Sequence, residues 1–274
     1  MQVVKRVFDF YIFSNIHVAF AVFSLTKITL LNYSIESNLL PWFTFFSTIA
    51  SYNLIRIYKV SKIQHWTFQF VKQHKKRILS LTFLSLCIVV YLSFLLKPKA
   101  LLTVIPFALF TLFYVVPIPI KKNSTIALRN IAFLKLFLIA ISWAGVTVLV
   151  PLLNYNIDLH HIEVVTFVQR FLFVVVITIP FDIRDVNFDS VNLKTIPQVI
   201  GIQQSKVFGL LFLLLFLGLE FFKGTMETVQ FRNHLVIAVL SLILLFRATT
   251  NQHKYYSAFF VESLPIIWLL LIKT

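Results

Sequence analysis

The chain has few of the residues that soluble proteins use most. Only ten of its 274 residues are Asp or Glu, five are glycine, and Cys87 is the single cysteine. One cysteine excludes a disulfide within the chain. Because no Gly/Ser-rich linker or shift in composition divides the sequence, we expect one domain that covers residues 1–274.

Apolar residues are abundant instead. They make up 59% of the chain, which has 31 Phe, and charged residues make up 13% against about 25% in an average soluble protein. Apolar stretches of roughly 17–25 residues recur, and each is long enough to cross a hydrocarbon core about 30 Å thick. They lie at residues 7–30, 38–58, 77–96, 99–120, 127–152, 164–182, 206–223, 233–249 and 255–272. We predict an all-α bundle of nine transmembrane helices.

The basic residues predict how this bundle is oriented. If the nine helices alternate in direction, 17 Lys and Arg fall on the side of the N-terminus and six on the other side. Cytoplasmic loops accumulate Lys and Arg, so we expect the N-terminus to be cytoplasmic, in a membrane of the bacterial inner-membrane type. The net charge of +15 then reflects this topology and contact with anionic lipids. Because the basic residues are dispersed among loops, we do not expect a nucleic-acid partner.

Three of the ten acidic residues lie close together at the predicted cytoplasmic end of one span. Asp182, Asp185 and Asp189 have the spacing i, i+3, i+7, which places them on one face of a helix. Their mutual repulsion is unfavourable unless a cation compensates it, and carboxylate oxygens are ligands that Mg²⁺ prefers. Such ions could bridge to a diphosphate. The alternative is a solvated helix end in which Arg184 pairs with a neighbouring aspartate.

A group of cations is expected at the same end of the bundle. Lys121 and Lys122 follow Tyr114, and Arg129 with Asn130 comes just after them. These side chains could hold phosphate oxygens beside the metal ions. They could equally be ordinary cytoplasmic flanking charges.

Several polar residues interrupt the apolar spans, where an isolated charge is costly and is usually paired. Some of them are expected to line a cavity, and Lys135 or Arg170 could instead form a structural ion pair with Glu262. Residues 59–76 predict either an amphipathic helix on the lipid headgroups, with its aromatic side chains inserted, or a solvated basic loop. The polar residues within the spans are Asn15, Asn53, Lys135, Arg170 and Glu262.

These features together resemble the UbiA family of intramembrane prenyltransferases over most of the chain. The stretch from Asp182 to Asp189 is similar to the family's second aspartate-rich motif, DxxDxxxD. Lys194–Pro197 and Gly201 resemble the threonine-proline-glycine segment that follows it, and Tyr114 followed by Lys121 resembles the family's tyrosine-to-lysine segment.

The resemblance implies a helical bundle around a lipid-open cavity. It also implies Mg²⁺-dependent ionisation of a polyprenyl diphosphate and attack on the allylic cation by an aromatic or other hydrophobic acceptor. By this resemblance Asp182, Asp185 and Asp189 are the catalytic residues and metal ligands. The residues expected to bind the diphosphate are Asn53, Arg56, Lys121, Lys122 and Arg184, and those expected to line the cavity are Asn15, Tyr114, Arg129, Asn130 and Glu262.

The sequence departs from the family at its first motif, NxxxDxxxD. That motif falls on Asn53, and Ile57 and Ser61 stand where the family has aspartates. Neither residue holds Mg²⁺ as a carboxylate does. Two interpretations stay open. In the first, Arg56, Lys59 and Lys62 replace one metal ion by binding the diphosphate directly and leave a single Mg²⁺ on the Asp182 side; in the second, catalysis is lost and the cavity only binds an isoprenoid lipid. A small transporter in which Glu262, Lys135 and Arg170 form a polar pathway is a third, although five glycines are few for the broken helices of many transporters.

Overall fold

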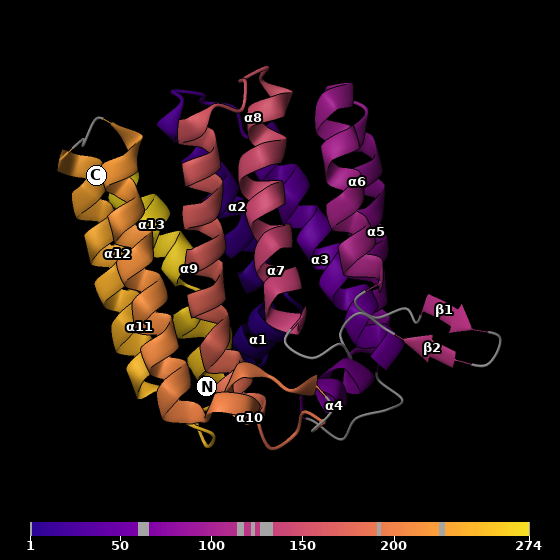
Figure 1. The fold of residues 1–274 in the computed structure, drawn as a ribbon. Coiled ribbons are helices and arrows are strands. Elements are labelled where there is room, and N and C mark those ends of the chain that lie inside the picture. The colour runs from indigo at the N-terminus through magenta and orange to yellow at the C-terminus, as the bar shows by residue number, and fades with distance from the viewer. Residues whose placement is uncertain are drawn as a thin grey trace.

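The computed structural model describes residues 2–59, 66–113, 118–121, 124–126, 134–190, 193–224 and 228–273, most of which form helices that run side by side (Figure 1). The first half of the chain forms α1 (Gln2–Phe13), α2 (Ile16–Asn32), α3 (Leu39–Lys59), α4 (Trp66–Gln73), α5 (Lys75–Ser93), α6 (Pro98–Phe113) and the strands β1 (Ile118–Lys121) and β2 (Ser124–Ile126). The second half forms α7 (Leu134–Ala144), η2 (Gly145–Leu149), α8 (Val150–Asn154), α9 (His161–Asp185), α10 (Ile196–Ile200), α11 (Ile202–Gly218), η4 (Leu219–Lys223), α12 (Thr228–Arg247), η5 (Tyr256–Val261) and α13 (Leu264–Lys273).

Among the described residues, six helices are long and apolar enough to cross a membrane, and a seventh span results if the bent pair α1–α2 counts as one. The predicted helical protein with several long apolar helices is therefore confirmed. A helix also lies in each of the nine predicted stretches, but the count of nine crossings stays a prediction.

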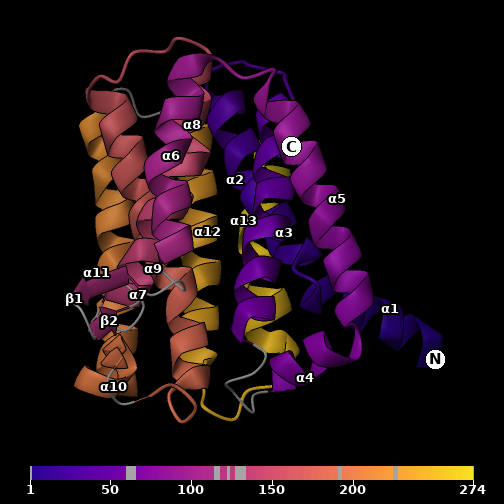
Figure 2. The same ribbon diagram turned by 90° about the vertical axis from the view of Figure 1, so that its right-hand side faces the viewer.

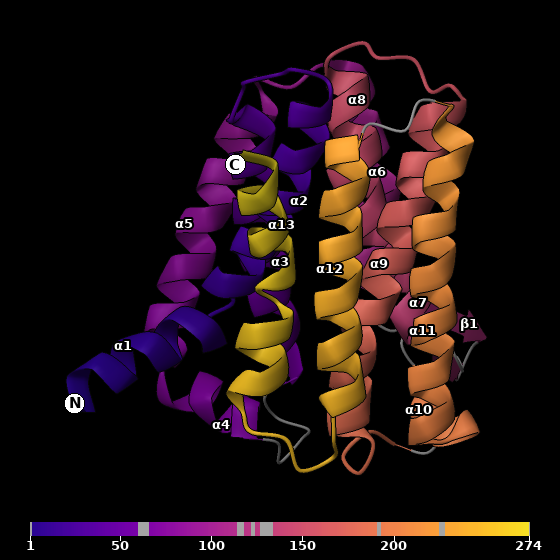
Figure 3. The ribbon, with the colours of Figure 1, turned by 90° about the vertical axis from the view of Figure 1, so that its left-hand side faces the viewer.

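Two of the predicted stretches are not continuous helices. The stretch 7–30 is broken after α1, because Asn15 has a φ of 68°, and α1 is bent by 52° against α2. As a result α1 projects from the bundle while α2 continues inside it (Figure 3). The stretch 99–120 is wrong at its end, where Ile118–Lys121 pairs with Ser124–Ile126 as an antiparallel hairpin. Pro119 explains this, since proline in a helix interior removes a hydrogen bond and clashes with the preceding turn.

The amphipathic helix expected within residues 59–76 is present as α4. However, the ring of Phe70 packs on Phe13, at a centroid distance of 5.5 Å, and stacks on His74 at 4.3 Å. Val71 is buried as well. The face of α4 that carries these two residues therefore packs on the protein and is not inserted among lipid headgroups.

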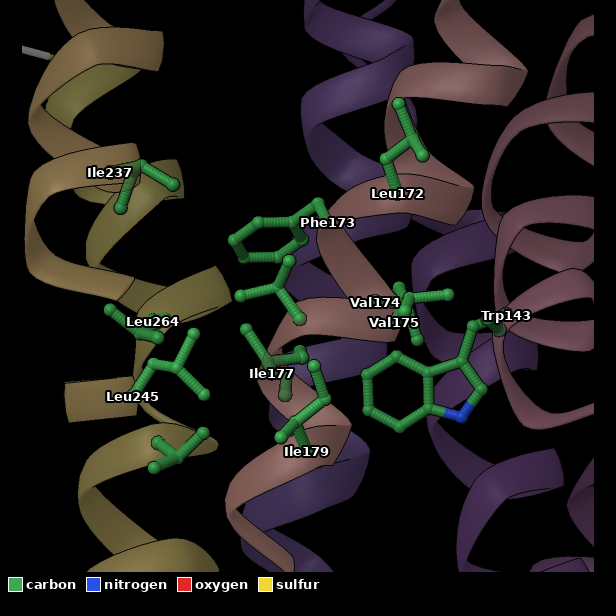
Figure 4. Close-up of a cluster of buried hydrophobic side chains, with 14 of the residues drawn as sticks. Trp143, Leu172, Phe173, Val174, Val175, Ile177, Ile179, Ile237, Leu245 and Leu264 are labelled. Atoms are coloured by element: carbon green, nitrogen blue, oxygen red, sulfur yellow. The ribbon is translucent and has the colours of Figure 1, made fainter. Parts of the chain in front are cut away.

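The helix α9 lies at the centre of the largest hydrophobic cluster. Its side chains Phe173, Val175 and Ile179 are fully buried. Figure 4 shows them between Trp143 of α7 on one side and Ile237 of α12 on the other. Because α9 is held on both sides, its C-terminal residues, which include the predicted aspartates, have a rigid support.

Candidate functional site

A pocket of about 930 Å³ lies between α3 and α5 on one side and α6, α7 and α9 on the other. These helices run side by side in two perpendicular views (Figures 1 and 2). Most of the lining is apolar. Its larger side chains include Phe43, Phe107, Leu138, Trp143, Ile177 and Phe181.

The pocket also has a charged part, which collects residues from four separate segments. Arg56 comes from the last turn of α3, Lys135 from the first turn of α7, and three residues from the last turn of α9. Because these helix ends lie at the same end of the bundle, residues far apart in sequence meet there (Figure 1). The charged residues of the lining are Arg56, Lys135, Asp182, Arg184, Asp185 and Glu262.

Lys135 links two of the three predicted aspartates. Its Nζ lies 2.8 Å from Oδ1 of Asp182 and 2.7 Å from Oδ2 of Asp189. The side chain of Asp182 is only 1% exposed, those of Lys135 and Asp189 17% and 20%. Oδ2 of Asp182 is buried without a hydrogen-bond partner among the described residues, so it is an acceptor that a ligand in the pocket could use.

The third aspartate has a different partner. Arg184 donates from Nε to Oδ1 of Asp185 at 2.7 Å and from Nη2 to Oδ2 at 2.9 Å, which is a bidentate pair. The pairing of Arg184 with an aspartate, expected in the solvated-helix alternative, is therefore present. Asp182 nevertheless lines the pocket in a buried position and does not face bulk water.

The helical spacing predicted for the three aspartates holds only in part. The helix α9 ends at Asp185, and Asp189 lies beyond it in a turn whose backbone N–H donates to the carbonyl of Asp185 at 2.8 Å. Asp182 and Asp189 still meet at Lys135, but Asp185 is turned to Arg184.

We compared this arrangement with the needs of a divalent cation. In the part of the chain that the structure describes, no group of three or more His, Cys, Asp or Glu side chains is placed to hold a metal ion. Lys135 lies between two of the carboxylates and Arg184 holds the third. The aspartates in this arrangement do not fit the Mg²⁺ site that the sequence predicts.

The two predicted residues at the end of α3 have different surroundings. Arg56 lines the pocket and donates from Nη1 to the carbonyl of Phe13 at 2.7 Å. Asn53 is fully buried and accepts a hydrogen bond of 2.7 Å from Nδ2 of Asn15. Neither Asn53 nor Asn15 is among the described residues of the pocket lining, so this pair joins α2 to α3.

Glu262 lines the pocket, and its electrostatic neighbours of opposite charge are Arg56 and Arg184. The ion pair expected for Glu262 with Lys135 or Arg170 is wrong. Lys135 contacts the two aspartates, and Arg170 donates to the carbonyl of Leu25 at 2.7 Å. Arg170 lies more than three turns nearer the opposite end of α9 than Asp182, away from the charged part of the pocket.

Several predicted site residues cannot be placed. Tyr114, Lys122, Arg129 and Asn130 lie outside the described residues. Lys121 ends β1, but its side chain is outside what the structure describes.

Lys135 is the residue of the pocket lining for which the sequence predicted the wrong partner. The alternating directions of the predicted spans place the start of α7 and the end of α9 on the same side of the membrane, but they do not show that the two contact each other. Tyr52 and Trp143 were also missed. Trp143 donates from Nε1 to the hydroxyl of Tyr52 at 3.0 Å, and both line the pocket.

Comparison of the chain with protein-family models, with curated proteins and with solved structures gives no match.

Proposed function

We propose that the protein is an intramembrane prenyltransferase of the UbiA type. It would bind a polyprenyl diphosphate and transfer the prenyl group to an aromatic or other hydrophobic acceptor. The observation that carries the proposal is the pocket, because one continuous space combines a long apolar lining with a cluster of charges that are buried or half-buried. An isoprenoid chain needs the apolar lining, and a diphosphate group needs the charged cluster.

The apolar lining suits an isoprenoid chain and the cation formed from it. Transfer breaks the bond between C1 and the diphosphate oxygen, and the electron pair leaves with the diphosphate. The acceptor then bonds to C1 and loses a proton. Aromatic faces attract a cation, and Tyr52, Phe107, Trp143 and Phe181 all line the pocket.

The charged part supplies the groups that a diphosphate requires. Arg56, Lys135 and Arg184 are cations within the lining, and a guanidinium matches phosphate oxygens in a fork of N–H donors. Asp182 holds the ammonium of Lys135 in the lining, so it is the carboxylate whose replacement we expect to weaken diphosphate binding. Mg²⁺ participation stays a prediction of the family resemblance.

The proposal includes the finer topology predicted from the sequence: nine crossings, a cavity open to lipid, and the aspartates at the cytoplasmic side. The distribution of basic residues supports this topology. The N-terminus, α4, the hairpin and α10 lie at one end of the bundle (Figure 1). The basic residues of the predicted cytoplasmic side fall mainly in these segments and beside them, among them Lys5, Lys75, Lys194 and Lys254.

A second function is favoured by one observation. Each aspartate of the cluster already has a cationic partner, because Lys135 contacts Asp182 and Asp189 and Arg184 pairs with Asp185. Ile57, which stands where the family has an aspartate, also lines the pocket. A protein that binds an isoprenoid lipid without transferring it would need the apolar pocket but no metal ion.

Two measurements on the purified full chain test these functions. The first is binding of radiolabelled geranylgeranyl diphosphate, with and without Mg²⁺. We expect Asp182→Asn to weaken binding at least about tenfold, equivalent to about 1.4 kcal/mol. Asp158→Asn is the matched control, because Asp158 is exposed and is not among the described residues of the pocket lining.

The second measurement is release of diphosphate when hydrophobic aromatic acceptors are added. Release that Asp182→Asn abolishes supports the transferase, and binding without release supports the isoprenoid-binding protein. If the wild-type chain does not bind the prenyl diphosphate in either condition, both proposals fail.

A further inference from the structure

The ammonium of Lys135 lies between two carboxylates and contacts both of them. Its Nζ is within 2.8 Å of an oxygen of Asp182 and within 2.7 Å of an oxygen of Asp189. These are the distances of charge-assisted hydrogen bonds. The two carboxylates come from the last turn of α9 and from the turn beyond it, and the ammonium reaches them from α7.

We infer that the Lys135 ammonium takes the place of a divalent metal ion between Asp182 and Asp189, so that the site binds its anionic ligand with the protein's own cations. This inference rests on the proposed function for the nature of the ligand. The contact between the ammonium and the carboxylates does not depend on it.

Burial makes the ammonium an integral part of the site. The side chain of Asp182 is 1% exposed, and a buried carboxylate needs a charged partner or loses several kcal/mol. Lys135 supplies that partner and also compensates Asp189. A metal ion could bind these oxygens only if the ammonium left, because two cations cannot share them at contact distance.

The remaining acidic residues do not complete a metal site. Both oxygens of Asp185 are held by Arg184. On the opposite wall of the pocket, the position of the family's first aspartate is Ile57, an apolar side chain. Because Lys135 already compensates Asp182, no metal ion is left between the two walls of the pocket for a carboxylate at position 57 to bind.

The direct test is metal binding, measured without any diphosphate. Mn²⁺ is titrated into the purified full chain, and free Mn²⁺ is followed by its paramagnetic resonance signal. We expect the wild-type chain to bind no Mn²⁺ at this cluster. Lys135→Met removes the ammonium but keeps most of the length of the side chain, and we expect it to gain one Mn²⁺ site at least about tenfold tighter than any in the wild type.

Further variants locate the gained site. Adding Asp182→Asn to Lys135→Met should abolish it, and Lys135→Arg, which keeps the charge, should not create it. Lys206→Met is the matched control, because Lys206 is also buried but donates to the carbonyl of Phe246 at 2.8 Å. If Lys135→Met does not fold, as judged by its thermal unfolding, Lys135→Gln takes its place.

Two results would overturn the inference. One is a Mn²⁺ site in the wild-type chain that Asp182→Asn removes, and the other is failure of folded Lys135 variants to gain a site. Binding of geranylgeranyl diphosphate separates this inference from the proposed function. If the prenyl diphosphate binds only with Mg²⁺, the role of Lys135 is refuted and the prenyl site is supported. If the Mn²⁺ results are as expected but the prenyl diphosphate does not bind, the role of Lys135 is supported and the prenyl site is refuted.

Discussion

Replacing Gly145 with alanine is predicted to destabilise the protein, although helix propensity alone predicts the opposite. Gly145 is the first residue of η2, and glycine inside a helix is less stable than alanine by about 0.5–1 kcal/mol. A Cβ atom at this position would overlap the ring atoms Cζ, Cε1 and Cε2 of Phe107. The absence of a side chain at Gly145 is what allows α6 to place Phe107 against the helix that follows α7.

The two effects have opposite signs, and their sizes decide the outcome. Phe107 is only 8% exposed, so its ring has neighbours on most sides and cannot move away freely. Inserting a methyl group into a packed region of this kind costs about 1–3 kcal/mol. Because the Cβ would overlap three ring atoms, the cost lies near the upper end of that range. Subtracting the gain in helix propensity, we expect Gly145→Ala to lower the free energy of unfolding by about 2 kcal/mol.

Unfolding of the purified protein in mild detergent by a denaturant measures this difference. Gly218→Ala is the matched control, because Gly218 ends α11 and a Cβ there meets no atom within 4 Å. We expect that control to be neutral or stabilising by up to about 1 kcal/mol. A double-mutant cycle with Phe107→Leu should recover most of the loss, since the ring that causes the overlap is then absent.

The reasoning is refuted if Gly145→Ala raises the free energy of unfolding as the control does. It is also refuted if the effects of Gly145→Ala and Phe107→Leu are additive, because the cost would then not come from the contact between these two residues.

The other predictions concern residues outside the pocket. Arg170→Ala should lower the free energy of unfolding by about 3 kcal/mol in the same assay, because it leaves a cavity and removes buried hydrogen bonds; no change would contradict this. Tyr33→Phe should cost about 1–3 kcal/mol, since Tyr33 donates a 2.6 Å hydrogen bond to the buried Glu163, and an unchanged stability would show that water replaces it. Burial alone lowers the pKa of Lys254, but its hydrogen bond to Asp9 contributes to raising that pKa above the ordinary 10.5. The resulting stabilisation of α1 should therefore be complete below pH 10.5 and be lost as the pH rises through the higher folded-state pKa. Thermal stability measured over this pH range should fall less in Lys254→Met than in the wild-type chain, because the variant lacks this contribution.

Much of the fold could be predicted from the sequence because apolar stretches of membrane length are themselves the signal. A helix lies in each stretch, and α9 was placed to within three residues at each end. The errors arose at Asn15 and Pro119, where the backbone departs from a helix within a predicted span. Hydrophobicity averaged over a whole span does not register one residue with a positive φ or one proline.

The site was less predictable. The scarcity of acidic residues and their spacing pointed to Asp182, Asp185 and Asp189, and the basic residue in the same turn, Arg184, does pair with one of them. The partner of the other two, Lys135, is 47 residues away from Asp182 in the sequence, at the start of a different helix. A long-range pair of this kind leaves no periodic pattern in a single sequence.

The sequence by itself determined that the chain is a bundle of apolar helices and that three of its ten acidic residues lie at the end of one of them, because composition and spacing are local properties. Only the tertiary structure decided what compensates those carboxylates. The contact between α7 and α9 places an ammonium between Asp182 and Asp189, and Arg184 takes Asp185, so the charge that the sequence left for a metal ion is balanced by residues of the chain. Packing between distant helices brings these charges together, and that packing depends on the shapes of many side chains at once.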